Sequence, residues 1–95
     1  MSLFAVFYTY AEGSDDKRDE HRPVHRAFLR ELHEAGKLKV CGPWGPEQPP
    51  GGMLIFEGES AAEIGELLDR DPFAEVGVVA ERSIKSWGIV IGGLD

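Results

Sequence analysis

Four short segments of the chain carry most of its aromatic and β-branched residues, a composition typical of β-strands. The segments are residues 3–10 (LFAVFYTY), 38–41 (LKVC), 53–56 (MLIF) and 82–90 (RSIKSWGIV). Neither face of the first segment is polar, because its side chains alternate between Leu3, Ala5, Phe7 and Thr9 on one side and Phe4, Val6, Tyr8 and Tyr10 on the other. We therefore expect both faces of this strand to be covered.

Apolar residues at three- and four-residue steps predict a first helix from Pro23 to about Ala35. Proline suits the first position of a helix, where its missing N–H would find no acceptor, and Gly36 can take the left-handed conformation that commonly ends one. The expected buried stripe consists of Val24, Ala27, Phe28, Leu32 and Ala35, with His25 beside it. Residues 11–22 are charged and polar, which favours a loop before Pro23, with a short helical turn at its end as the alternative.

A second helix is predicted to begin at Ser60, because Ser60 and Glu63 form a capping box in which each side chain binds a free backbone N–H. Its buried stripe is Ile64, Leu67 and Leu68. The helix should end near residue 70, since Pro72 disfavours helical geometry at Asp71. Residues 71–77 then form a turn with room for one further helical turn.

The order strand, helix, strand, strand, helix, strand predicts an α+β fold of the ferredoxin-like βαββαβ type. Residues 1–95 form a single domain in this interpretation, with a four-stranded antiparallel sheet and two helices on one face. Two helices cover only one face, although the strands offer apolar side chains to both. A second subunit's sheet is the economical cover, so we expect a homodimer.

Composition narrows the partners. The chain has 10 Lys and Arg against 17 Asp and Glu, a net charge of −7, and its basic residues are scattered along the sequence, so nucleic acid is not an expected partner. No apolar run approaches a membrane-spanning length, and no targeting segment is recognised. The single cysteine, Cys41, fits a reducing compartment. A cytoplasmic protein without membrane contact is expected.

His25 is the titratable residue that the pattern places closest to the core, since Phe28, Leu29 and Leu32 follow it at three, four and seven steps. Histidine serves as a general base because its ordinary pKa is about 6.5. The alternative is a core histidine whose ring binds a backbone carbonyl group.

Other candidates receive simpler interpretations. His21 and His25 have a chelating spacing, but a helix that begins at Pro23 leaves His21 outside it, so no metal site and no cofactor are predicted. His33 should be an exposed residue near the end of the helix. Cys41 is expected to pack in the core. Tyr8, Trp44 and Phe73 are candidates for the wall of a substrate pocket, with core or interface packing as the alternative.

Three short motifs resemble, in their order and spacing, the YciI-like family of small dimeric α+β barrel proteins. They are residues 22–25 (RPVH), residues 38–43 (LKVCGP) and residues 71–73 (DPF). The resemblance implies a His and Asp active-site pair at His25 and Asp71. It also implies kinship with a dehydrochlorinase of a chlorinated hydroxyquinol and a fold similar to muconolactone isomerase.

A carboxylate that binds one imidazole nitrogen fixes the tautomer and leaves the other nitrogen as a base. Asp71 can do this for His25 only if the second helix ends beside the first; otherwise it simply opens a turn before Pro72. Two functions follow. One is a cofactor-independent isomerase or lyase that moves a proton on a small cyclic or aromatic-derived substrate, and the other is a non-catalytic small-ligand-binding or accessory protein.

Overall fold

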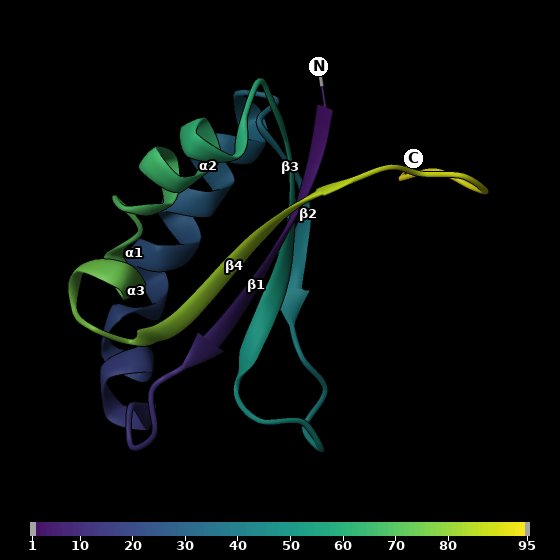
Figure 1. Ribbon diagram of the computed structural model, residues 1–95. Coiled ribbons are helices and arrows are strands. Elements are labelled where there is room, and N and C mark those ends of the chain that lie inside the picture. The colour runs from purple at the N-terminus through teal and green to yellow at the C-terminus, as the bar shows by residue number, and fades with distance from the viewer. Residues whose placement is uncertain (1, 95) are drawn as a thin grey trace.

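The computed structural model describes residues 2–94, which form one antiparallel sheet with three helices on one of its faces (Figure 1). In chain order the elements are β1 (Ser2–Tyr10), α1 (Asp15–Glu34), β2 (Leu38–Pro43), β3 (Gly51–Gly58), α2 (Ala61–Leu68), α3 (Pro72–Glu75) and β4 (Val79–Trp87). The strands lie in the order β2-β3-β1-β4. The predicted ferredoxin-like fold is confirmed. Helix α3 is the further helical turn that was expected within residues 71–77.

The core lies between the helices and the facing side of the two central strands. Phe4 of β1 pairs with Phe56 of β3, and Val6 pairs with Leu54, so these four side chains point to the same face of the sheet. Ile64 and Leu68 of α2 pack against them, and all six are buried. Burial of this kind is the main favourable contribution to folding.

Helix α1 begins eight residues earlier than Pro23, so the predicted loop over residues 11–22 is wrong for most of its length. Asp15 and Asp16 lie in the first turn, where acidic side chains are favourable, and Arg18 and Arg22 form ion pairs with Asp15 and Asp19 one turn before them. These residues form a solvated helical segment that carries too few apolar side chains to show a period. Pro23 therefore lies inside the helix.

The buried stripe of α1 also differs from the predicted one. Val24 is 52% exposed and Ala27 is exposed, whereas His25 and Leu29 are the buried residues of the helix. His25 thus lies at the centre of the packed face. The end of the helix is as predicted, since Gly36 has a φ of 81° directly after the cap residue Ala35.

Strand β4 runs over 79–87 instead of the predicted 82–90, because its length is set by its partner β1. Val79 pairs with Tyr10 and Trp87 pairs with Leu3, near the two ends of β1. In the same way β3 begins at Gly51, which pairs with Thr9. Pairing with a neighbouring strand, and not apolar content, decides where these strands start and stop.

The start of α2 is close to the predicted capping box. Ser60 Oγ accepts a hydrogen bond of 3.1 Å from the backbone N–H of Glu63. The Glu63 carboxylate accepts from the N–H of Glu59, also at 3.1 Å, and not from that of Ser60. Among residues 2–94, no helix is both long enough and apolar enough to cross a membrane.

Candidate functional site

Three elements bring one polar side chain each to the same buried point. Tyr8 lies near the end of β1, His25 lies on the packed face of α1, and Asp71 is the residue before α3. His25 Nδ1 and Asp71 Oδ1 are 2.7 Å apart, although 46 positions separate them in sequence. The end of α2 therefore does approach α1, as the predicted pair requires.

The Asp71 carboxylate is held by three donors. Oδ1 accepts from His25 and from the backbone N–H of Phe73 at 2.9 Å, and Oδ2 accepts from the Tyr8 hydroxyl at 2.9 Å. The Asp71 side chain is 0% exposed. An ionised carboxylate can only accept hydrogen bonds, so in the neutral form of the imidazole the proton lies on Nδ1, toward Asp71, and the lone pair is on Nε2.

The Tyr8 hydroxyl remains a donor over the ordinary pH range. Burial raises the pKa of Tyr8 above its usual value, and the nearby Asp71 carboxylate raises the pKa further. Sequence reasoning placed Tyr8 in a pocket wall and missed its bond to Asp71. The available signal was its position on the helix-facing side of β1, the side that also carries Phe4 and Val6.

Phe73 fixes the plane of the His25 ring. The two rings are stacked, with their centroids 3.8 Å apart and an angle of 5° between them. Tyr10 also contacts Phe73, in an edge-to-face arrangement with the ring centroids 5.6 Å apart. The imidazole is thus held by a hydrogen bond at one nitrogen and by a flat apolar surface along one face.

A cavity of about 710 Å³ opens beside His25, between α1 and strands β2 and β3. This volume is suited to a small organic molecule. Tyr8, His25 and Phe73 line it, together with Leu29 and Leu54. The predicted third pocket residue, Trp44, does not: it packs against Phe7, which points to the helix-free face of the sheet, at a centroid distance of 6.0 Å.

Cys41 also borders this cavity, so the prediction of a core cysteine is wrong. Cys41 of β2 pairs with Leu54 of β3. Because β2 is an edge strand, the Cys41 side chain is exposed. Partial burial of the sulfur against the cavity wall, and then the Asp71 carboxylate, raise the pKa of the Cys41 thiol. A raised pKa keeps the thiol protonated, which disfavours a nucleophilic role.

The other histidines bind backbone carbonyl groups. His21 lies within α1, contrary to prediction, and its Nδ1 is 3.0 Å from the Lys17 carbonyl oxygen. His33 is exposed as expected, and its Nδ1 is 2.8 Å from the Leu38 carbonyl oxygen. In the described part of the chain, no three His, Cys, Asp or Glu side chains gather into a possible metal site.

Comparison with known proteins assigns the chain to a family. The model of the YCII-related domain matches residues 2–88. The chain belongs to the YCII-related family. Protein YciI of Escherichia coli is 31% identical over 93 residues, a match that covers 90% of this chain and 95% of the relative, and protein YciI of Shigella flexneri matches equally.

Among solved structures, this YCII-related chain resembles the 5-chloro-2-hydroxyhydroquinone dehydrochlorinase TftG of Burkholderia phenoliruptrix, in complex with 2,5-dihydroxybenzoquinone. The TM-score is 0.77 at 28% identity, covering 90% of this chain and 93% of TftG. An antibiotic biosynthesis monooxygenase shares the fold alone, with a TM-score of 0.59 at 10% identity over 96% of this chain and all of that one.

Proposed function

We propose that this YCII-related protein is a cofactor-independent enzyme that transfers a proton on a small cyclic or aromatic-derived substrate, with His25 as the base and Asp71 as its partner. The observation that carries the proposal is the 2.7 Å contact between His25 Nδ1 and Asp71 Oδ1 at the edge of a cavity. A buried histidine in the simpler, structural role would bind a backbone carbonyl group instead of a carboxylate at the edge of a cavity.

The residues divide the chemistry between them. His25 Nε2 accepts a proton from a ring carbon or hydroxyl group of the substrate, and the negative charge of Asp71 stabilises the imidazolium that forms. Tyr8 and the N–H of Phe73 hold the carboxylate in place while the charge on the imidazole changes.

The relationship to TftG supports isomerisation or elimination over other reaction types. Dehydrochlorination removes a proton and a chloride ion, so it needs a base but no redox step. The match of 28% identity over 90% of this chain makes elimination of HX a reasonable first reaction to assay.

The test is a screen for base-catalysed proton removal. Purified protein is incubated in D₂O with cyclic hydroxy, keto and chlorinated aromatic compounds, including 5-chloro-2-hydroxyhydroquinone, and NMR follows deuterium incorporation while an electrode follows chloride release. We expect at least one compound to exchange or eliminate faster than in buffer, and a His21→Gln control to retain that rate, since His21 does not line the cavity. Compounds that bind with no exchange and no elimination would favour the non-catalytic ligand-binding alternative.

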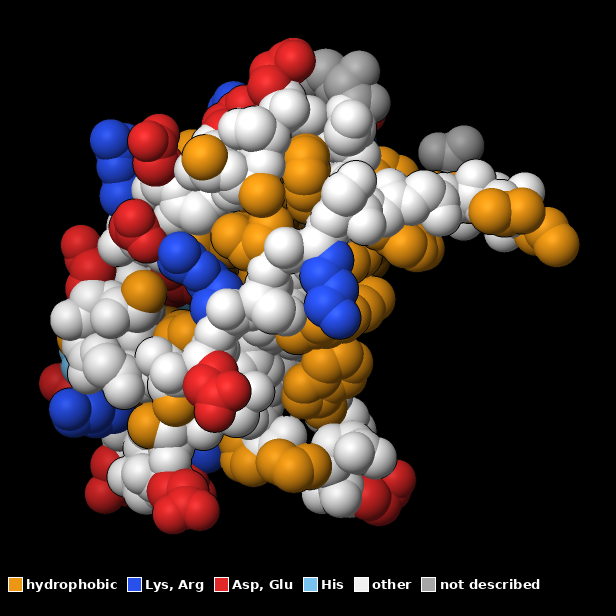
Figure 2. All heavy atoms as spheres, in the orientation of Figure 1, with side chains coloured by type: hydrophobic (Ala, Val, Ile, Leu, Met, Phe, Trp, Pro, Cys, Tyr) orange, Lys and Arg blue, Asp and Glu red, His pale blue; other side chains and the backbone are white. Residues whose placement is uncertain are grey.

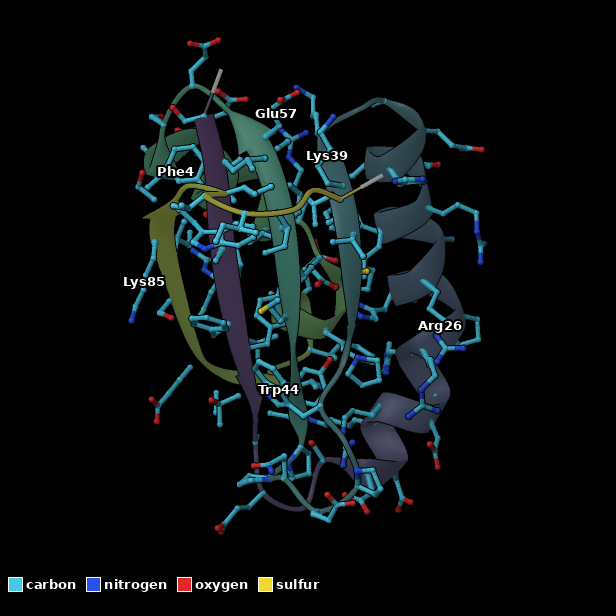
Figure 3. All side chains as sticks on the ribbon, turned by 90° about the vertical axis from the view of Figure 1, so that its right-hand side faces the viewer. Phe4, Arg26, Lys39, Trp44, Glu57 and Lys85 are labelled. Carbon is cyan, nitrogen blue, oxygen red and sulfur yellow. The ribbon has the colours of Figure 1, made fainter. Side chains whose placement is uncertain are left out.

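The assembly proposed with this function is a homodimer whose two sheets face each other. Large apolar side chains are exposed on the helix-free face of the sheet and on the segment after β4, as Figure 2 shows in orange. Trp87, which pairs with Leu3 on that face, is 41% exposed, and Val90 and Ile91 are both 93% exposed. In Figure 3 the segment after β4 passes in front of this face.

Light scattering at micromolar concentration is expected to report twice the monomer mass of 10.5 kDa. Val90→Asp combined with Ile91→Asp should shift this mass toward the monomer, because a second subunit would bury both charges. Val24→Asp is the matched control, since Val24 is exposed on α1, away from the sheet. A monomer that persists at high concentration would contradict the proposed assembly.

A further inference from the structure

Basic side chains are concentrated around the cavity. Those that line it are Arg18, Arg22, Arg26, Arg30 and Lys39. The chain has 10 Lys and Arg in all, so half of them border one cavity. It also has 17 Asp and Glu, yet none of them is among the lining residues. The cavity is therefore a positive region in a chain whose net charge is −7.

The four arginines follow one another at four-residue steps along α1. Residues at this spacing are neighbours on a helix surface, and like charges there destabilise an isolated helix. The row is consequently unfavourable for α1 itself. A row of this kind is expected where an anion outside the helix balances the charge.

Acidic side chains of the protein balance only part of the positive charge around the cavity. Arg18 binds Asp15 at 2.7 Å, Arg22 binds Asp19 at 2.8 Å, and the Lys39 ammonium group lies 3.3 Å from the Glu57 carboxylate. These contacts account for three of the five basic side chains around the cavity.

Arg26 and Arg30 differ from the other three. Within residues 2–94, neither forms an ion pair, and both are exposed. The positions three and four residues away from Arg26 hold Arg22, Pro23, Leu29 and Arg30, so no acidic side chain is available to it along the helix. Figure 3 labels Arg26 on α1 and Lys39 on β2, the two elements on either side of the cavity.

The walls restrict the kind of anion. Apart from the basic side chains, the cavity is lined mainly by apolar and aromatic side chains that include Leu29, Leu54 and Phe73. An inorganic anion gains little from such walls, because its oxygens need donors on every side. A molecule with an apolar ring and one ionised group is complementary to both parts of the cavity.

We propose that the ligand of this cavity is a small ring-bearing organic acid, whose carboxylate binds Arg26 and Arg30 while its ring lies beside His25. The inference rests on the proposed function, because it assigns a substrate class to the same site. Guanidinium groups bind carboxylates through paired hydrogen bonds, which also orients the ligand. The acid group thus positions the ring for proton transfer to Nε2 of His25.

The test compares 2,5-dihydroxybenzoate with 2,5-dihydroxybenzamide, which share a ring but differ in charge, by calorimetric titration of the unmodified protein. We expect the acid to bind about tenfold more tightly than the amide, the difference of a charge-assisted hydrogen bond. Arg26→Gln and Arg30→Gln should each remove most of this preference and leave the affinity for the amide unchanged. Arg70→Gln is the control, since it changes the net charge equally at an exposed position that does not line the cavity.

Equal affinity for the acid and the amide would overturn the inference. The inference would also be overturned if the acid did not bind at concentrations up to about 10 mM. A loss of the preference for the acid in Arg70→Gln as large as in Arg26→Gln or Arg30→Gln would overturn it as well. The same titration on His25→Gln separates this inference from the proposed function. If that variant keeps the preference for the acid while the unmodified protein shows no exchange or elimination, the proton-transfer proposal fails and the assignment of the ligand class stands.

Discussion

Replacing His25 with glutamine is expected to lower turnover by about 10²- to 10⁴-fold, the usual contribution of a positioned general base. Glutamine keeps a polar side chain of similar length but has no group that accepts a proton near neutral pH. The measurement is kcat on whichever compound exchanges or eliminates in the screen. His21→Gln is the matched control, because His21 lies on the same helix and binds a backbone carbonyl group, but does not line the cavity.

Comparing kcat with KM shows whether His25 acts as the base or only has a structural role in the core. If His25 acts in the transition state alone, kcat should fall while KM changes little. A His25→Gln variant that keeps the kcat of the unmodified protein would show that the base is another group. In that case the pair of His25 and Asp71 would be a structural device of the core.

Replacing Asp71 with alanine is expected to lower the free energy of unfolding by roughly 3–5 kcal/mol. The physical reason is that three buried donors lose their acceptor at once: the His25 ring, the Tyr8 hydroxyl and the N–H of Phe73. Asp71 also caps α3, so the turn that carries Phe73 is weakened. Urea denaturation followed by circular dichroism measures the change.

Asp71→Asn is expected to cost much less stability than Asp71→Ala. The amide oxygen can occupy the place of Oδ1, where it accepts from His25 and Phe73, and the amide nitrogen can donate to the Tyr8 oxygen. Geometry and tautomer are then preserved and only the negative charge is lost, so turnover should still fall. Asp69→Ala is the control, since Asp69 is exposed and binds Arg82 at the surface. A loss in Asp71→Ala no larger than in Asp69→Ala would contradict this account.

Local sequence signals predicted the elements that depend on local chemistry. The cap at Ser60, the left-handed Gly36 and the turn before Pro72 are all fixed by side chains within a few residues of them. Periodicity also predicted the order of the elements and therefore the ferredoxin-like fold. The role of Asp71 in the site was predicted from the resemblance of residues 71–73 to a family motif, because the neighbouring residues alone indicate only a turn before Pro72.

Features that depend on distant partners could not be read in the same way. The ends of β4 are set by pairing with β1, and the start of α1 is supported by ion pairs in a segment without apolar residues. The bond from Tyr8 to Asp71 joins positions 63 apart, and the placement of Trp44 on the other face of the sheet depends on its contact with Phe7. Such contacts exist only once the chain is folded.

The protonation pattern of the His25 ring shows whether Asp71 orients the base, and it can be measured without a substrate. Long-range ¹H–¹⁵N correlation spectra of the protein with its His25 ring in the neutral form distinguish the two ring nitrogens. The signals that are lost in His25→Gln assign this ring. We expect Nδ1 to carry the proton, held by Asp71, and Nε2 to be unprotonated. A neutral His25 ring with its proton on Nε2 would contradict this expectation.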